Sequence, residues 1–370
     1  MKIGLLGFGV VGRGVYEITE NRTDMQVTKV LCLEEISLPD AQAVKHIDEI
    51  VRDETIDTVV EAMGGLHPAY EFVRAALEAG KNVVTSNKAL VATFYDELLA
   101  LADSKGVMIR CTAAVGGGIG WLSELERARR VEKIHRVGGI MNGTCNFILD
   151  SMTRLGLSYK EALRQAQSLG YAEANPTTDV DGIDTWHKLI ISANVAFGLS
   201  LDKSQVPAAG IRNITAADVE NFSARGMVCK LVSNAVNRNG LIRAWVQPTL
   251  FTHQEPESVV PANYNLITLE GDVSGRQSFY GQGAGRYPTA YNVVQDLVDM
   301  TRGTGFYSKP EAAAPITNDL PLRYYVRGDW TGPVESRWGE AFITAPTPVD
   351  QMHEWLQAHP DAFIAAMPGA

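Results

Sequence analysis

The sequence predicts an α/β protein, with an N-terminal Rossmann-type dinucleotide-binding domain followed by an α+β domain that has a mixed sheet. Three observations lead to this prediction. A G-x-G-x-x-G pattern, formed by Gly7, Gly9 and Gly12, follows an apolar run at the start of the chain. Apolar runs then alternate with helix-patterned stretches up to about residue 130. Beyond that point the runs carry hairpin signals, above all Asn-Gly at 239–240.

The first domain is expected to cover residues 1–130. Its strands are the runs "KIGLLGFG", "VTKVLCLEE", "DTVVEAMGG", "NVVTSNKAL" and "VMIRCTAAVGGG", in that order. The stretches between them include "VVGRGVYEITEN", "PAYEFVRAALEAG" and "FYDELLALADSKG", which have helical patterns. Strands that alternate with amphipathic helices form a parallel sheet with crossover helices. We therefore expect a doubly wound unit.

A second, mixed domain is expected at residues 131–285. It begins with "EKIHRVGGIMNGTCNFILDSMTRLG", which has the pattern of a strand followed by helix, and "YKEALRQAQSLG" continues as helix. The Asn-Gly signal predicts one hairpin, and "NLITLEGDVSGRQSFYGQGAG" predicts another pair of strands. Residues 289–303 have a helical pattern. Residues 306–370 are Pro-rich and less regular, with a short helix near 349–359, and are expected to form a short C-terminal extension.

Composition excludes several classes of partner. The chain has 370 residues, 45% of them hydrophobic and 21% charged, with a formal net charge of -10. This charge argues against nucleic acid or an anionic membrane surface as the main partner, and no uninterrupted apolar run is long enough to span a bilayer. The four cysteines, Cys32, Cys111, Cys145 and Cys229, form no C-x-x-C pair. We expect reduced thiols in a cytoplasmic protein and no structural metal.

The glycine motif predicts a nucleotide site. Gly7 allows a tight turn, and Gly9 lets the backbone approach a pyrophosphate at the N-terminus of a helix, where unpaired N–H groups favour anions. The alternative is a glycine-rich turn with no ligand. The motif's expected cofactor contacts are Gly7, Phe8, Gly9, Val10, Val11 and Gly12.

The end of the second strand favours NAD over NADP. An acidic residue there binds the ribose hydroxyls of NAD, whereas a nearby cation accommodates the 2′-phosphate of NADP. The strand ends in "LCLEE", which places Glu34 and Glu35 at this position and no cation at Leu33. The alternative is that the two glutamates begin a solvated loop.

A cluster of charges lies in "GYAEANPTTDVDGIDTWHK", residues 170–188. Asp181 could cap a helix, and Asp184 and Lys188 have the i,i+4 spacing of an ordinary surface ion pair. A calcium loop is excluded because Ile183 occupies its fifth position and no glutamate stands at its twelfth. Local pattern alone leaves a catalytic role and a cap with a surface pair as alternatives.

Seven segments together resemble the homoserine dehydrogenases, in order and at family-like spacing: "GFGVVG", "NKAL", "AVGGGI", "GIMNGTCNFIL", "GYAEANPTTDVDGIDTWHKL", "VQPTL" and "FYGQGAGRYPTA". These enzymes interconvert L-homoserine and L-aspartate 4-semialdehyde with a nicotinamide cofactor, in the biosynthesis of threonine and methionine. The resemblance implies a Rossmann domain, a substrate and dimerisation domain, and a homodimer or homotetramer. It also implies that the helix at 286–305 packs back on the nucleotide domain.

The resemblance assigns roles to individual residues. Lys188 would be the general acid/base, Lys88 would lie beside the reacting oxygen and the nicotinamide, and Asp184 would orient Lys188. A lysine exchanges protons near neutral pH when burial or a second cation favours its neutral form. Glu173 and Asp179 would bind substrate. Further contacts to cofactor or substrate are implied for Gly64, Gly170, Tyr171 and Gly285.

The chain departs from the family pattern in "TAAVGGGIG". Thr112 replaces a glutamate that contributes to a monovalent-cation site in relatives, together with backbone carbonyls near Val115 and Gly117, and Gly120 replaces a proline. A hydroxyl is a weaker ligand for a hard cation than a carboxylate, so only a weak site is expected here. The C-terminal extension is too short for a complete regulatory ACT domain. Two alternatives remain: a related dehydrogenase for another amino-acid aldehyde or ketone, and a non-catalytic nucleotide sensor.

Overall fold

The computed structural model describes residues 1–303 and 313–368, which form two compact units. Unit 1 comprises Met1–Val131, Asn194–Ser200 and Gln282–Ala312; unit 2 comprises Glu132–Ala193, Leu201–Gly281 and Ala313–Ala370. The end of the helix expected at 286–305 and the start of the extension expected at 306–370 lie outside the described residues. No described helix is long and apolar enough to cross a membrane.

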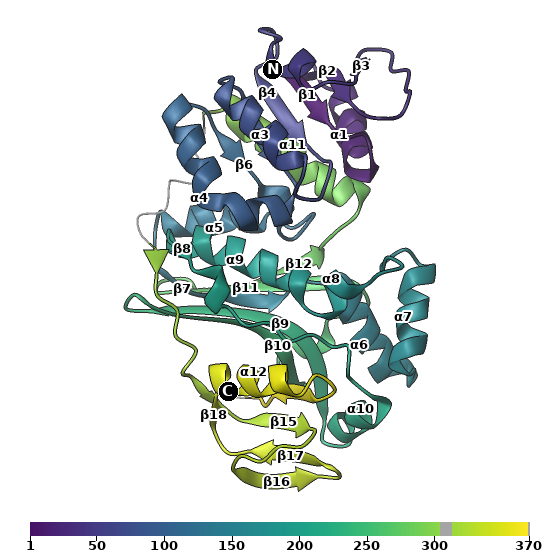
Figure 1. Ribbon diagram of the computed structural model, residues 1–370, viewed down its shortest axis with the longest axis vertical. Coiled ribbons are helices and arrows are strands. Elements are labelled where there is room, and N and C mark those ends of the chain that lie inside the picture. Colours follow the sequence, from purple (N-terminus) through teal and green to yellow (C-terminus); the bar gives the residue numbers. More distant parts are fainter. Residues whose placement is uncertain (304–312, 369–370) are drawn as a thin grey trace. The chain divides into compact units, whose positions relative to one another are not determined.

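Unit 1 is built on a six-stranded parallel sheet in the order β3-β2-β1-β4-β5-β6 (Figure 1). This is the strand order of a Rossmann fold, in which ligands bind where the order reverses, here between β1 and β4. The expected α/β class is therefore confirmed. The strands are β1 (Lys2–Leu6), β2 (Gln26–Leu31), β3 (Gln42–Val44), β4 (Thr58–Glu61), β5 (Asn82–Thr85) and β6 (Ile109–Arg110).

Two helices that are far apart in the sequence pack together in unit 1. Gly14 of α1 faces Ala290 of α11 so closely that a Cβ on Gly14 would lie 2.9 Å from the Ala290 Cβ. Both helices bury apolar side chains, such as Val15 and Val293, in one core with Leu5 of the sheet. The helices of unit 1 are α1 (Val10–Glu20), α2 (Asp48–Val51), α3 (Ala69–Glu78), α4 (Lys88–Lys105), η1 (Thr112–Ala114), α5 (Trp121–Arg129) and α11 (Arg286–Thr301).

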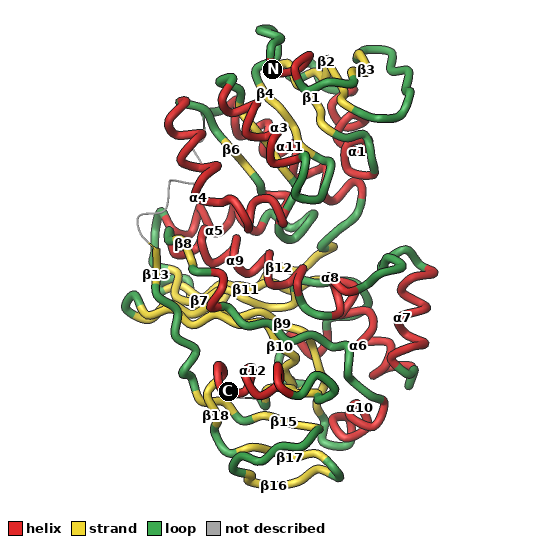
Figure 2. The backbone as a smooth tube through the Cα atoms, in the orientation of Figure 1, coloured by secondary structure: helices red, strands yellow, loops and turns green. Residues whose placement is uncertain are grey.

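Unit 2 is built on a nine-stranded mixed sheet in the order β12-β11-β7-β9-β10-β19-β15-β17-β16 (Figure 2). The hairpin predicted from Asn-Gly is present: Asn239 and Gly240 both have positive φ and join β9 to β10. The nine strands of this sheet are β7 (Ile134–Ile140), β9 (Met227–Arg238), β10 (Leu241–Thr252), β11 (Tyr264–Gly271), β12 (Gly275–Gln282), β15 (Tyr324–Arg327), β16 (Val334–Trp338), β17 (Ala341–Thr344) and β19 (Phe363–Ala366). Two further pairs form two-stranded sheets: β8 (Ser200–Leu201) with β13 (Ala313–Ala314), and β14 (Pro321–Leu322) with β18 (Thr347–Pro348).

The C-terminal segment differs from the irregular extension that the sequence suggested. Its strands β19, β15, β17 and β16 continue the sheet of unit 2, and α12 covers them with a core that includes Trp330 and Met352. The order and the helix correspond to a split β-α-β arrangement in which a short loop, residues 328–333, stands where a first helix would be. The segment was hard to recognise because β15, β16 and β17 follow one another without helices between them, so the alternation that marks unit 1 is missing.

The helices of unit 2 lie on or beside this sheet (Figure 1). They are α6 (Gly143–Leu155), α7 (Tyr159–Ser168), α8 (Thr177–Val180), α9 (Ile183–Phe197), η2 (Lys203–Gln205), α10 (Ala216–Ser223), η3 (Pro256–Val259) and α12 (Val349–Ala358). Helix α9 begins in unit 2. Residues 141 and 142 join the end of β7 to the start of α6, so Asn142 is the N-cap of α6.

Candidate active site

The glycine motif forms the turn between β1 and α1 in unit 1. Gly7 has φ 91°, and a Cβ on Gly12 would lie 2.1 Å from the Gly7 carbonyl oxygen, so both positions need glycine. A Cβ on Gly9 would meet no atom within 4 Å. Gly9 also precedes α1 without a side-chain cap. The N-terminus of α1 therefore leaves open space and unpaired N–H groups for a pyrophosphate, which fits a dinucleotide cofactor.

Other residues of the motif flank this turn. Val10 and Val11 begin α1, and Val10 is 66% exposed. The Phe8 ring lies under the guanidinium of Arg13, 4.7 Å from its centroid, and the Phe8 carbonyl accepts a hydrogen bond from Arg13 Nε. Arg13 is thereby held beside the motif.

The end of β2 carries both acids and cations. Arg13 Nη2 lies 3.6 Å from Glu34 Oε2, and both side chains are well exposed. Lys45 Nζ donates to the carbonyl oxygens of Cys32, Leu33 and Glu34 at 2.8–3.2 Å. The sequence has no cation at position 33, but the fold brings the side chains of Arg13 and Lys45 close to the end of β2. Each of them already has partners.

The turn after β4 is held by a buried carboxylate that the sequence did not single out. Glu61 Oε1 accepts from the backbone N–H groups of Met63 and Gly64, and Oε2 accepts from Thr85 Oγ1 at 2.5 Å. Asn87 donates from Nδ2 to the Gly65 carbonyl and accepts from Leu90 N, which caps α4. Lys88 is the first residue of α4 and is partly buried. Gly64 and Lys88 thus stand at the carboxyl ends of neighbouring strands, β4 and β5.

Gly285 lies at the N-terminus of α11 in unit 1, with φ 123°. Arg286, which follows it, pairs with Glu17 of α1. The start of α11 is therefore tied to the helix that carries the glycine motif.

Lys188 and Asp184 form a buried ion pair in unit 2. Lys188 Nζ lies 2.8 Å from Asp184 Oδ2, and the two side chains are only 9% and 5% exposed. Nζ also donates to the Met141 carbonyl at 2.7 Å. The pair is therefore not the exposed surface pair that i,i+4 spacing alone would suggest. An ammonium has three N–H donors, so one donor remains beyond these two contacts.

Asn142 joins the acidic residues into one cluster. Its Nδ2 donates to Asp179 Oδ1 at 2.7 Å and to Asp184 Oδ2 at 2.8 Å. Its Oδ1 accepts from Cys145 N at 2.7 Å, which caps α6. Asn142 is 4% exposed, and both of its N–H donors and its carbonyl oxygen are used. Sequence reasoning missed this residue, although Asn before a helix start is an N-cap signal.

The rest of the α6 N-terminus holds the loop that precedes the aspartates. Thr144 Oγ1 donates to the Tyr171 carbonyl at 2.6 Å, and the Tyr171 ring makes an edge contact with Phe147. Gly170 follows α7 with φ 76°, and a Cβ at this position would meet no atom within 4 Å. The Glu173 side chain is exposed, while its carbonyl accepts from Gln167. Among the predicted substrate residues, Asp179 is enclosed by polar neighbours and Glu173 faces solvent.

Cys145 of α6 also contacts this acidic cluster. Its Sγ–H donates to the Asp179 carbonyl at 3.1 Å. Burial, together with the charges of Asp179 and Asp184, raises the pKa of the Cys145 thiol well above its usual value. The thiol therefore stays neutral and acts as a donor rather than as a nucleophile.

Asp181 does not cap α9, contrary to expectation. It is the residue that ends α8, and its carboxylate pairs with Arg212 at 2.7 Å. The carbonyl of Gly182 accepts from Trp186 N and begins α9 instead. Gly182 has φ 82°, a conformation that aspartate adopts less readily than glycine. Asp181, which the sequence suggested as the N-cap of α9, is instead the C-cap of the short helix α8.

The predicted cation site lies in unit 1, in the loop after β6. Thr112 Oγ1 donates to Asp296 Oδ1 at 2.7 Å, and the Gly117 carbonyl accepts from Asn292. Val115 is fully buried in the same loop. No group of three or more His, Cys, Asp or Glu side chains suited to a metal occurs among the described residues.

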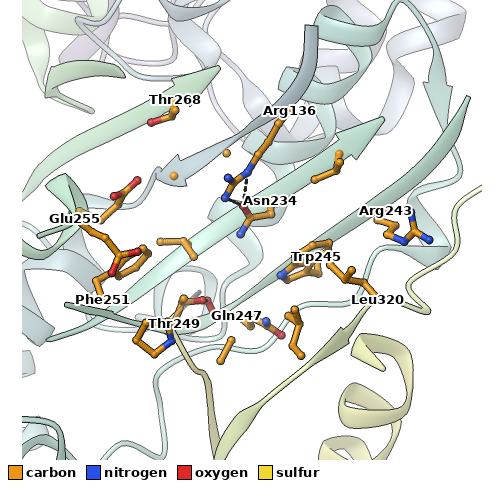
Figure 3. Close-up of a pocket in the computed structure, with 18 of the residues that line it drawn as sticks. Arg136, Asn234, Arg243, Trp245, Gln247, Thr249, Phe251, Glu255, Thr268 and Leu320 are labelled. Carbon is orange, nitrogen blue, oxygen red and sulfur yellow. Dashed lines mark hydrogen bonds between the residues drawn. The ribbon is translucent and has the colours of Figure 1, made fainter. Parts of the chain in front are cut away.

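A large cavity of unit 2 contains none of these predicted residues. It has a volume of about 570 Å³ and lies on one face of β7, β9, β10 and β11, lined by residues such as Arg136, Asn234, Trp245 and Gln247 (Figure 3). In Figure 3 the guanidinium of Arg136 points to Asn234, and their hydrogen bond measures 2.8 Å. Gln247 Nε2 and Glu257 Oε2 are buried there without a partner among the described residues. The cavity is therefore separate from the Lys188 cluster.

Comparison with known proteins gives consistent matches. The family model described as homoserine dehydrogenase matches residues 121–298, and its NAD binding domain matches residues 7–112. The chain is 38% identical to the homoserine dehydrogenase of Lactococcus lactis over 88% of this chain and 82% of the relative. It is also 38% identical to that of Bacillus subtilis, over 82% and 73%. Among solved structures, a homoserine dehydrogenase from Thiobacillus denitrificans aligns with TM-score 0.88 at 30% identity, covering 99% of this chain and 98% of that one.

Proposed function

The chain belongs to the homoserine dehydrogenase family, and we propose how its own residues carry out that family's reaction. It is an oxidoreductase that acts on the CH–OH group of homoserine. The observation that carries the proposal is the buried cluster of Lys188, Asp184 and Asn142. A nicotinamide cofactor, when bound, would supply or accept the hydride. The protein must then move a proton at the substrate oxygen.

Lys188 is proposed as the general acid/base. In the oxidation direction its neutral amine takes the hydroxyl proton of homoserine, and in reduction its ammonium donates a proton to the aldehyde oxygen. The contacts of Nζ with Asp184 and the Met141 carbonyl support this role, because they fix the nitrogen and leave one N–H direction for substrate. Asp184 stabilises the ammonium that forms when the proton is taken.

Asp179, Glu173 and Tyr171 are proposed to bind the amino-acid end of the substrate. A carboxylate is the natural partner for the α-ammonium of homoserine. Asp179 is supported by its fixed position on Asn142, and Glu173 by its exposed carboxylate on the adjoining loop. Lys88, Gly64, Gly170 and Gly285 remain proposed contacts of cofactor or substrate.

NAD is proposed as the preferred cofactor. Glu34 is well placed for ribose hydroxyls at the end of β2, and its charge, with that of Glu35, disfavours a 2′-phosphate. Arg13 is the residue that could reverse this preference, but it is already paired with Glu34. A hyperthermophilic archaeal relative was solved in complex with NADPH, at 24% identity, so cofactor choice must be measured in this protein.

The experiment is a steady-state assay of the purified protein with L-homoserine and either NAD or NADP, followed by absorbance of the reduced nicotinamide. We expect turnover with both cofactors and a higher kcat/KM for NAD. Absence of turnover with either would refute the catalytic roles. Inactive protein that still binds cofactor would favour the sensor alternative. A higher kcat/KM for NADP would refute only the argument from Glu34.

We also propose a homodimer or homotetramer whose subunits meet at the cavity face of β7, β9, β10 and β11. The support is the hollowed face itself, on which the partly exposed apolar side chains of Val236 and Phe251 lie among charged ones such as Arg136, a mixture that suits contact with a second copy. Val236→Arg on this face should lower the mass measured by light scattering. Val273→Arg, on an exposed turn of the same unit, is the matched control. An unchanged mass for Val236→Arg would contradict this interface.

The expected place of the enzyme is the threonine and methionine branch of amino-acid biosynthesis. The described cysteines are all free thiols, which is typical of a reducing compartment such as the cytoplasm.

A further inference from the structure

The family resemblance assigns a monovalent cation to the loop of residues 112–120, but hydrogen-bond donors from α11 contact the carbonyls of this loop. The family resemblance implies a cation bound by a glutamate at position 112 and by carbonyls near Val115 and Gly117. A hard cation requires oxygen lone pairs that point at it. The contacts of the oxygens in the loop of residues 112–120 therefore decide whether a cation fits there.

Asn292 of α11 contacts two carbonyls of this loop. Its Nδ2 lies 2.5 Å from the Gly117 carbonyl oxygen and 3.1 Å from that of Ile119. Asn292 is 1% exposed. The reverse orientation of the amide would place its oxygen against two carbonyl oxygens, so the hydrogen-bond network assigns the nitrogen to this position. An N–H₂ group thus lies where two carbonyl oxygens converge.

The buried carboxylate beside this loop has a counter-charge within the protein. Asp296 of α11 accepts from Thr112 N and Thr112 Oγ1 at 2.8 and 2.7 Å. Arg110 Nε donates to the same carboxylate at 3.0 Å, and the Arg110 and Asp296 side chains are both 0% exposed. Arg110 Nη2 also pairs with the partly exposed Asp299 at 2.7 Å. A guanidinium keeps its charge in proteins, so this carboxylate has a permanent counter-charge.

We propose that the Asn292 amide and the Arg110 guanidinium replace the monovalent cation of the family. The amide joins the carbonyls of Gly117 and Ile119, which a cation would otherwise hold together, and the guanidinium supplies the positive charge. Both groups belong to unit 1. The protein is therefore independent of Na⁺ and K⁺, and this inference does not depend on the roles proposed for Lys188 or Lys88.

The test measures thermal unfolding of the full chain in NaCl, KCl and N-methylglucamine chloride at equal ionic strength. The wild-type melting temperature should be the same in all three salts. Asn292→Asp replaces the N–H₂ group by an oxygen of nearly the same shape and so brings a carboxylate beside two carbonyls. This variant should unfold about 3 °C or more below wild type in N-methylglucamine and recover in NaCl.

Asn21→Ala provides the matched control, because Asn21 is an exposed asparagine of the same unit. It should leave the melting temperature and its salt response unchanged. A wild-type melting temperature that rises specifically with Na⁺ or K⁺ would overturn the proposal, and this arm needs no variant to fold. An Asn292→Asp protein that matches wild type in every salt would overturn it as well.

Discussion

Asn142→Ala should separate a helix cap from a positioning residue. The substitution removes two hydrogen bonds to carboxylates, at 2.7 and 2.8 Å, and one cap bond to Cys145 N. A hydrogen bond to a charged group contributes about 1.5–3 kcal/mol, and an N-cap about 1 kcal/mol. If one charged bond orients Asp184 in the transition state, kcat/KM should fall by about 10- to 150-fold.

The assay is kcat and KM over a range of pH, with unfolding in urea measured in parallel. Asn142→Asp gives a sharper result, because it places a third carboxylate within hydrogen-bond distance of Asp179 and Asp184. A proton can supply the missing donor, so the activity of this variant relative to wild type should increase as the pH falls.

Ser158→Ala is the matched control for the cap. Ser158 caps α7 in the same unit, and among the described residues its side chain bonds only within its capping box. It should lose about 1 kcal/mol of stability and keep its kcat/KM. The positioning role of Asn142 is wrong if Asn142→Ala behaves in the same way.

Three further predictions concern other parts of the protein. Lys188→Arg keeps the charge but cannot release a proton, so kcat should fall by about 10²- to 10⁴-fold with a smaller change in KM; near-normal kcat would exclude Lys188 as the general acid/base. Glu34→Ser releases Arg13 for a 2′-phosphate, so the ratio of kcat/KM for NADP over NAD should rise about tenfold or more, and an unchanged ratio would refute the role of Glu34. Burial lowers the pKa of His353 from 6.5 to about 4. Its contribution to stability is therefore complete above pH 6.5 and decreases by up to about 3 kcal/mol as the pH falls towards 4. The free energy of unfolding, measured with urea from pH 7.5 to 4.5, should show this loss in wild type. It should depend less on pH in His353→Gln, whose amide can still hydrogen-bond to Gln247. Parallel pH profiles for the two proteins would contradict the role of His353.

Local features could be predicted from the sequence because short-range geometry determines them. Gly7 and Gly12 are required by one tight turn, and Asn239-Gly240 by another. Their backbone conformations are open to few other residues, so the sequence signal is strong. The alternation of strands and helices, and with it the Rossmann order of unit 1, follows from periodicity over segments of ordinary length. The C-terminal strands are as long as β4 and β5, but β15, β16 and β17 follow one another without the intervening helices that made the strands of unit 1 recognisable.

The arrangement of side chains around the site was decided by the tertiary structure. Asn142 reaches Asp179 and Asp184 across 37 and 42 residues, and Asn292 reaches Gly117 across 175. Whether Asp184 and Lys188 are exposed or buried depends on what packs over α9, which i,i+4 spacing does not specify. The sequence by itself determined the family, the nucleotide turn and the acidic stretch with its lysine. Only the fold decided that Asn142 binds both aspartates and that Asn292 donates to the carbonyls of Gly117 and Ile119, because such contacts arise from the packing of elements distant in the chain.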